Sequence, residues 1–88
     1  MIRRRVVIRG TVQGVFFRDS CRQLANRRRV AGWVSNRADG AVEAVFEGDQ
    51  VDVDAMVDWA RTGPSQAVVT SLEVIEEEPQ GERGFGVV

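Results

Sequence analysis

Histidine is absent from this chain of 88 residues, and its absence removes several kinds of catalytic chemistry. Without histidine the chain cannot form a Ser-His or Cys-His nucleophilic pair, a phosphohistidine or a histidine-ligated zinc site. Cysteine occurs once, at Cys21, so neither an internal disulfide nor a cysteine cluster for a metal can form. A single cysteine is typical of proteins from a reducing compartment.

Long apolar runs are also missing from the sequence. No stretch approaches the ~20 residues that a membrane-spanning helix needs, and the arginine-rich N-terminus has no apolar segment of signal-peptide length. We therefore expect a cytoplasmic protein that does not associate with membranes. The length allows a single domain, residues 1–88, with one modest core. Nothing in the sequence demands more than a monomer.

Lysine is absent too, so every positive side chain is an arginine, whose forked guanidinium suits phosphate oxygens. Residues 1–37 hold ten arginines and one acid, a balance of +9, whereas residues 38–88 hold twelve acids and two arginines, a balance of −10. Two interpretations remain open. Neighbouring elements pair these charges across the surface, or the basic half contains an anion site, because a positive field concentrates anions.

Apolar alternation predicts strands and apolar spacing of three and four residues predicts helices. The predicted elements are a strand Arg3–Val12, a helix Phe17–Arg28, a hairpin of strands Ala31–Asn36 and Ala41–Glu47 around an Asp-Gly turn, a helix capped by Asp49 and stopped by Gly63-Pro64, a strand Val68–Glu77 and a short strand Phe85–Val88. Because strand-helix-strand units cross over right-handedly, both helices lie on one face of an antiparallel-type sheet. The order β-α-β-β-α-β, with a short C-terminal strand, predicts an α+β fold of the ferredoxin-like split βαβ type.

The segment between the first strand and the first helix has the features of an anion-binding loop. Backbone amides at a helix start lack intrahelical partners and lie at the positive end of the helix dipole. If the loop curls at Gly14, the amides up to Arg18 converge on one concavity, and the Arg18 guanidinium completes it with a forked contact. We expect Phe16 and Phe17 to anchor the loop on the core. These features by themselves also fit a plain connection with a solvated Arg18.

Two segments carry a resemblance to a known family. Gly10–Arg18 reads G-T-V-Q-G-V-F-F-R and resembles the first signature of the acylphosphatase family at every fixed position. Gly32–Gly40 reads G-W-V-S-N-R-A-D-G and resembles the second. The resemblance covers nearly the whole chain, and two ordered signatures at the right separation are a specific signal.

The resemblance implies an enzyme that hydrolyses the carboxyl-phosphate anhydride of a small acyl phosphate, without a metal, a cofactor or a covalent enzyme intermediate. It implies that Arg18 binds the phosphoryl group and that Asn36 positions the attacking water. The implied phosphate-binding loop consists of Gln13, Gly14, Val15, Phe16, Phe17 and Arg18.

The chemistry of these residue types agrees with that implication. A carboxylate is a good leaving group, so the reaction needs mainly positioning and stabilisation of charge on the phosphoryl oxygens. The amide of Asn36 can both accept and donate hydrogen bonds to a water. Because an amide is a poor base, we expect the proton of the water to leave to the substrate phosphate.

Two residues depart from the family pattern. Ser35 replaces a larger or basic residue before the asparagine and removes one possible contact to the substrate or sheet surface. Arg29 stands where glycine is frequent after the first helix, which costs roughly 1 kcal/mol if the backbone there is left-handed. Neither departure touches Arg18 or Asn36.

A cysteine-dependent phosphatase is one alternative, since Cys21 and Arg27 have the Cys-x5-Arg spacing of that class. That chemistry requires the cysteine at the start of a phosphate loop. The intervening residues contain no glycine and continue the helical periodicity, so we expect Cys21 to be a buried small residue.

An RNA-binding module is the alternative from another class, because Arg83–Val88 resembles the aromatic octapeptide of RNA-recognition motifs, which share the ferredoxin-like topology. Binding there depends on exposed sheet aromatics that stack bases. Here Val87 stands where an aromatic is wanted, and the net charge of −1 gives little attraction to a phosphate backbone. We expect no nucleic-acid partner.

Acylphosphatase-like domains also occur as modules in larger carbamoyl-transfer maturation enzymes. The 88 residues hold no further domain. We therefore expect a free-standing hydrolase.

Overall fold

A computed structural model describes residues 1–88 and has the predicted order of elements. The elements are β1 (Ile2–Thr11), α1 (Phe17–Arg27), β2 (Ala31–Asn36), β3 (Val42–Gly48), α2 (Gln50–Ala60), β4 (Val68–Glu77) and β5 (Phe85–Val87). Each predicted strand end lies within one residue of the observed end. Neither helix has the length and apolar character needed to span a bilayer.

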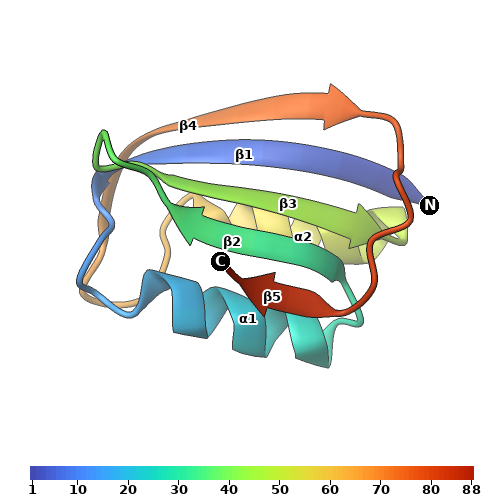
Figure 1. Cartoon of the computed structure of the whole chain (residues 1–88). Helices are drawn as coiled ribbons and strands as arrows, with labels where there is room; N and C mark the ends of the chain where they lie inside the picture. The colour runs from blue at the N-terminus through green and yellow to red at the C-terminus, as the bar shows by residue number, and fades with distance from the viewer.

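The five strands form one sheet in the order β4-β1-β3-β2-β5, and both helices cover the same face of it (Figure 1). The pairs β1–β3, β1–β4 and β2–β3 are antiparallel, and only β5 runs parallel to its neighbour β2. This arrangement confirms the predicted ferredoxin-like α+β fold. It also makes β1 and β2 parallel to each other, since both are antiparallel to the strand β3 between them.

The core lies between the sheet and the helices and contains 16 buried apolar residues. On β1 the alternating residues Val6 and Ile8 point into it and are fully buried, as the period-two pattern predicted. The two helices meet where the ring of Phe17 packs on that of Trp59, with centroids 5.1 Å apart. Phe17 therefore fixes the start of α1, and with it the end of the preceding loop.

The start of α2 confirms Asp49 as the N-cap residue but not as a side-chain cap. Asp49 has the extended backbone of an N-cap, and its carbonyl oxygen accepts hydrogen bonds from the amides of Asp52 and Val53, at 3.0 and 2.9 Å. Its carboxylate makes no capping hydrogen bond. The helix start thus depends on backbone geometry.

The C-terminus of α1 ends in a Schellman motif whose left-handed residue is Arg29, with φ 57°. The amide of Val30 donates to the carbonyl of Ala25 at 2.9 Å, and the amide of Arg29 donates to that of Asn26 at 3.3 Å. Val30 and Ala25 are both buried, which completes the apolar contact of the motif. The conditional expectation for Arg29 is therefore met: a residue with a Cβ holds a position that favours glycine.

Most of the ion pairs in the structure involve arginines of β1. Arg3 is only 2% exposed, and its guanidinium contacts Glu47 at 2.6 Å, Glu77 at 2.8 Å and Glu82 at 2.9 Å. Arg5 adds contacts to Glu43 at 2.6 Å and to Glu77 at 2.8 Å. For this cluster, pairing between neighbouring strands is the correct interpretation of the divided charges.

Glu47 is as deeply buried as Arg3, and it also holds the chain that follows β4. Its carboxylate accepts hydrogen bonds from three consecutive amides, those of Gln80, Gly81 and Glu82, at 2.8 to 3.1 Å. Burial alone would raise the pKa of Glu47, but these amides and the Arg3 guanidinium together lower it below its ordinary value. The ion pair thus fixes the β4–β5 connection to the sheet.

We predict that Arg29→Gly stabilises the protein. The substitution removes the Cβ from a residue with left-handed backbone and should raise the free energy of unfolding by roughly 0.5–1 kcal/mol. For a chain of this size, each kcal/mol corresponds to a rise in Tm of about 4–8 °C. Arg27→Gly is the matched control, because this residue is the last one of α1 with helical backbone and glycine there should lower the free energy of unfolding, by up to about 1 kcal/mol. Thermal unfolding of both variants measures the difference, and a lower Tm for Arg29→Gly would contradict the prediction.

We predict that Glu77 contributes to the free energy of unfolding and that this contribution is lost in acid. Hydrogen bonds from Arg5 and Arg3 lower the pKa of this carboxyl to about 2. Because the folded pKa lies below the unfolded value of about 4.3, its contribution is complete above that value and is lost as the pH falls toward about 2. Urea unfolding between pH 6 and pH 2 should therefore show a shallower decline for Glu77→Gln than for the wild type. Glu78→Gln, at an acid without an ion pair, should follow the wild-type curve, and equal slopes for all three proteins would refute the prediction.

Candidate active site

The loop after β1 has the backbone of an anion-binding turn. Gly14 has φ 75° and Phe16 has φ 65° and ψ 24°, so two left-handed residues separated by one position precede α1. Left-handed residues in such turns create the concavities of amides called nests. The amides of Gly14, Val15 and Phe16 donate to no protein carbonyl, and those of Phe17 and Arg18 open the helix without intrahelical acceptors. The loop therefore presents consecutive free N–H groups.

The two phenylalanines of the loop point to opposite environments. Phe17 is buried and anchors the loop on the core, as predicted. The same expectation for Phe16 is wrong, because its side chain is 72% exposed. Phe17 occupies the core position beside Trp59, and the left-handed backbone of Phe16 leaves the preceding ring in solvent.

Arg18 is exposed in the first turn of α1 and takes part in no ion pair. The nearest acid in the sequence, Asp19, is held by Arg22 and Gln23, each at 2.9 Å. The guanidinium of Arg18 is thus free of ion pairs, on a residue whose own amide belongs to the row of free amides. The anion-site interpretation of the basic half of the chain therefore stays a prediction, and the charge pairing on β1 leaves room for it.

Asn36 is the last residue of β2, opposite Val42 on β3. Its side-chain oxygen Oδ1 is buried and has no hydrogen-bond partner in the protein. Leaving a buried acceptor unpaired costs about 1–3 kcal/mol, so such atoms call for an explanation. Ser35, beside it, donates from its hydroxyl to the Asn36 carbonyl at 3.2 Å and contributes no charge to the site.

Gln13 joins the loop to the β2–β3 hairpin. Its Nε2 donates to the carbonyls of Arg37 and Ala41, at 2.8 and 3.0 Å. The loop and the end of β2 consequently lie at the same end of the sheet, on the left in Figure 1. The signature placed Gln13 in the loop, but nothing in the sequence indicated where its amide would go.

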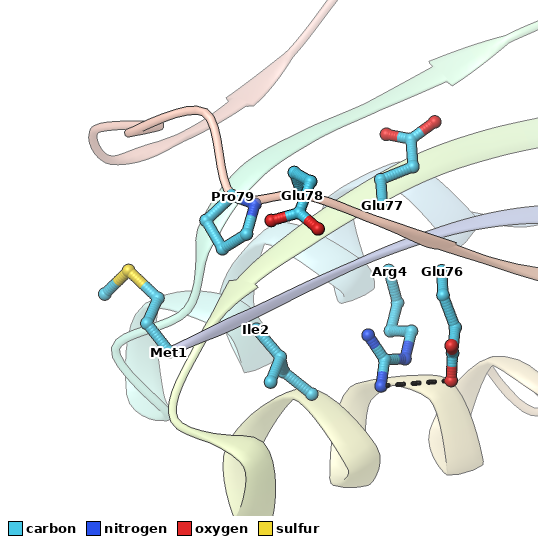
Figure 2. Close-up of a pocket in the computed structure, with 7 residues that line it drawn as sticks. All are labelled: Met1, Ile2, Arg4, Glu76, Glu77, Glu78 and Pro79. Atoms are coloured by element: carbon cyan, nitrogen blue, oxygen red, sulfur yellow. Dashed lines mark ion pairs between the residues drawn. The ribbon is translucent and has the colours of Figure 1, made fainter.

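The one pocket of the structure lies at the other end of β1, with a volume of about 490 Å³ (Figure 2). It is lined by Met1, Ile2, Arg4, Glu76, Glu77, Glu78 and Pro79. Its only arginine is paired with Glu76 at 3.4 Å and is therefore not free to bind a phosphate. None of the predicted site residues lines this pocket, so the predicted site is an open surface. No group of three or more Cys, Asp or Glu side chains is arranged to hold a metal ion.

The structure argues against both alternatives, the cysteine-dependent phosphatase and the RNA-binding module. Cys21 is fully buried in α1, and burial raises the pKa of its thiol to about 12, so it is not a thiolate nucleophile at neutral pH. Phe85 packs on the core side of the sheet, stacked on Phe46 with centroids 6.1 Å apart, where it cannot stack a base. On the helix-free face, the guanidinium of Arg5 lies 5.4 Å from the ring centroid of Trp33.

Comparisons with known proteins agree on one family. The Acylphosphatase family model matches residues 4–87. An acylphosphatase from Rubrobacter xylanophilus is 56% identical over 85 residues, covering 94% of this chain and 76% of the relative. The crystal structure of acylphosphatase from Bacillus subtilis superposes with a TM-score of 0.95 at 36% identity, covering 100% of this chain and 99% of that one. Full-length HypF contains a similar region with a TM-score of 0.91 and 28% identity, which covers 99% of this chain and 12% of HypF.

Proposed function

The chain belongs to the acylphosphatase family, and on that basis we propose that Arg18 and the loop amides hold the phosphoryl group while Asn36 places the attacking water. The family assignment gives the reaction, in which water cleaves the carboxyl-phosphate anhydride of an acyl phosphate. The products are a carboxylate and inorganic phosphate.

The phosphoryl group binds at the start of α1. Two or three of its oxygens accept hydrogen bonds from the amides between Gly14 and Arg18, which have no acceptors within the protein. Arg18 supplies the net positive charge, and its fork contacts two oxygens at once. Because these donors are fixed before the substrate arrives, they stabilise the charge on the equatorial oxygens without reorganising.

The unpartnered Oδ1 of Asn36 is the observation that carries the proposal. Asn36 is only partly buried and its side chain makes no hydrogen bond within the protein, so a turn of the amide about its last torsion brings Oδ1 to the surface. A water that then donates one hydrogen to this oxygen is held at the end of β2, beside the loop. Its oxygen attacks phosphorus as the bond from phosphorus to the acyl oxygen breaks, and the electron pair of that bond leaves with the carboxylate. The second hydrogen of the water passes to a phosphoryl oxygen, so no protein base is needed.

The remaining expectations complete the proposal. We propose that residues 1–88 act as a monomeric, cytoplasmic enzyme on small acyl phosphates, without a metal, a cofactor or a nucleic-acid partner. The buried, unreactive Cys21 is compatible with a reducing compartment. The open surface of the site offers few contacts to the acyl part, so we propose weak selectivity among acyl groups.

We predict that Arg18→Gln abolishes most of the hydrolysis of a simple aromatic acyl phosphate measured in EDTA. Losing a charge-assisted fork to phosphate should lower kcat/KM on the order of 10²-fold or more. Arg22→Gln is the control, because this exposed arginine lies one turn further along α1 and pairs with Asp19. Full activity in Arg18→Gln, or none in the wild type with EDTA, would sink the proposal.

We predict that Asn36→Ala lowers kcat while phosphate still binds. Losing one preorganised contact to the reacting water should reduce kcat by roughly 10²–10³-fold, and competitive inhibition by inorganic phosphate should change little. Steady-state kinetics with phosphate as inhibitor separates the two effects. If Asn36→Ala weakened phosphate binding and left kcat intact, the asparagine would belong to the phosphate site instead.

A further inference from the structure

The side chain of Gln13 has no place in the phosphate cradle, although Gln13 lies in the loop. Its Nε2 is held between two carbonyl oxygens of the β2–β3 hairpin, those of Arg37 and Ala41, at 2.8 and 3.0 Å. Two acceptors face this end of the side chain, so only the NH₂ group fits there. These bonds cross 24 and 28 residues of sequence. They are the only side-chain hydrogen bonds that residues 12–16 make.

The hairpin does not need Gln13 in order to close. The carbonyl of Ala41 also accepts the amide of Arg37 at 2.8 Å, and the carbonyl of Arg37 accepts the amide of Gly40 at 3.1 Å. Asp39 secures the turn further by accepting the amide of Ala41 at 3.1 Å. Gln13 therefore adds a second donor to carbonyls that already have one. The feature that depends on Gln13 is the distance between the loop and the hairpin.

That distance matters because Asn36 directly precedes Arg37. The side chain of Asn36 makes no hydrogen bond of its own, and Oδ1 is buried without a partner. Its position relative to the loop is consequently set by the backbone at residues 36 and 37. Gln13 is the first residue of the loop, and its hydrogen bond to the carbonyl of Arg37 joins the loop to this backbone.

We propose that Gln13 is a positioning residue, which sets the distance between the phosphate loop and the water held by Asn36. This inference rests on the proposed roles of the loop and Asn36. In-line attack requires the water oxygen within about 3–3.5 Å of phosphorus, and a shift of 1 Å in such a geometry can cost about 10²-fold in rate. Gln13 acts on kcat through Asn36 and leaves the binding of phosphate to the amides and Arg18.

The test is a double-mutant cycle on kcat with Gln13→Met, which keeps the length of the side chain and removes the donor. Against the wild type, kcat should fall by roughly 10-fold or more, while the inhibition constant of inorganic phosphate stays within about threefold. In the Asn36→Ala background the same substitution should change kcat by less than about threefold, because the water is no longer held. Gln50→Met, at the start of α2, is the control for the chemical change.

The outcomes separate the inference from the proposed function. Equal losses of kcat in both backgrounds, a loss of phosphate binding as large as the loss of kcat, or unchanged kcat in Gln13→Met would each overturn the role of Gln13. Wild-type kcat in Asn36→Ala would instead overturn the water-positioning proposal itself. Tm measurements identify a variant that does not fold, and Gln13→Leu then repeats the cycle with a branched apolar side chain.

Discussion

The position of β1, with β3 on one side and β4 on the other, determines where the proposed site residues lie. The connection from β1 through α1 crosses over and returns as β2, parallel to β1 with β3 between them. The carboxyl ends of β1 and β2 therefore reach the same end of the sheet. The loop follows one of these ends and Asn36 stands at the other. A strand order that separated β1 and β2 further would move Asn36 away from the proposed phosphate loop.

At the opposite end of the sheet, arginines of β1 form ion pairs with acids of the neighbouring strands. A buried ion pair costs desolvation, and removing one partner typically costs about 3–5 kcal/mol. Arg3 and Glu47 offset that cost with further hydrogen bonds, from two more acids and three backbone amides. Four acids of β3 and β4 thereby engage the arginines of β1, and none of them forms an ion pair with Arg18. Much of the divided charge is thus paired between strands, while Arg18 takes part in no ion pair.

Local pattern was enough to predict the order of elements, the buried faces and the loop, because burial repeats with the period of each element. Local pattern failed to predict the burial or contacts of a side chain where these depend on residues distant in the sequence. Phe16 and Phe17 look equivalent in sequence, yet only one core position exists beside Trp59. The burial of Arg3 follows from its register opposite Glu47 and Glu77, which periodicity does not reveal. The same holds for the side chain of Gln13, whose acceptors come from a hairpin that must first be placed.

The absence of a pocket at the site limits how the enzyme can work. Without enclosing walls, little binding energy comes from the acyl group, and water is not excluded by the protein. The proposed mechanism therefore relies on a few donors held at fixed distances, and the substrate allows this because its carboxylate leaves without general acid catalysis. Under that condition the separation between the loop and Asn36 is the quantity the fold has to maintain. Phe17 fixes the loop against the core on one side, and Gln13 fixes it against the hairpin on the other.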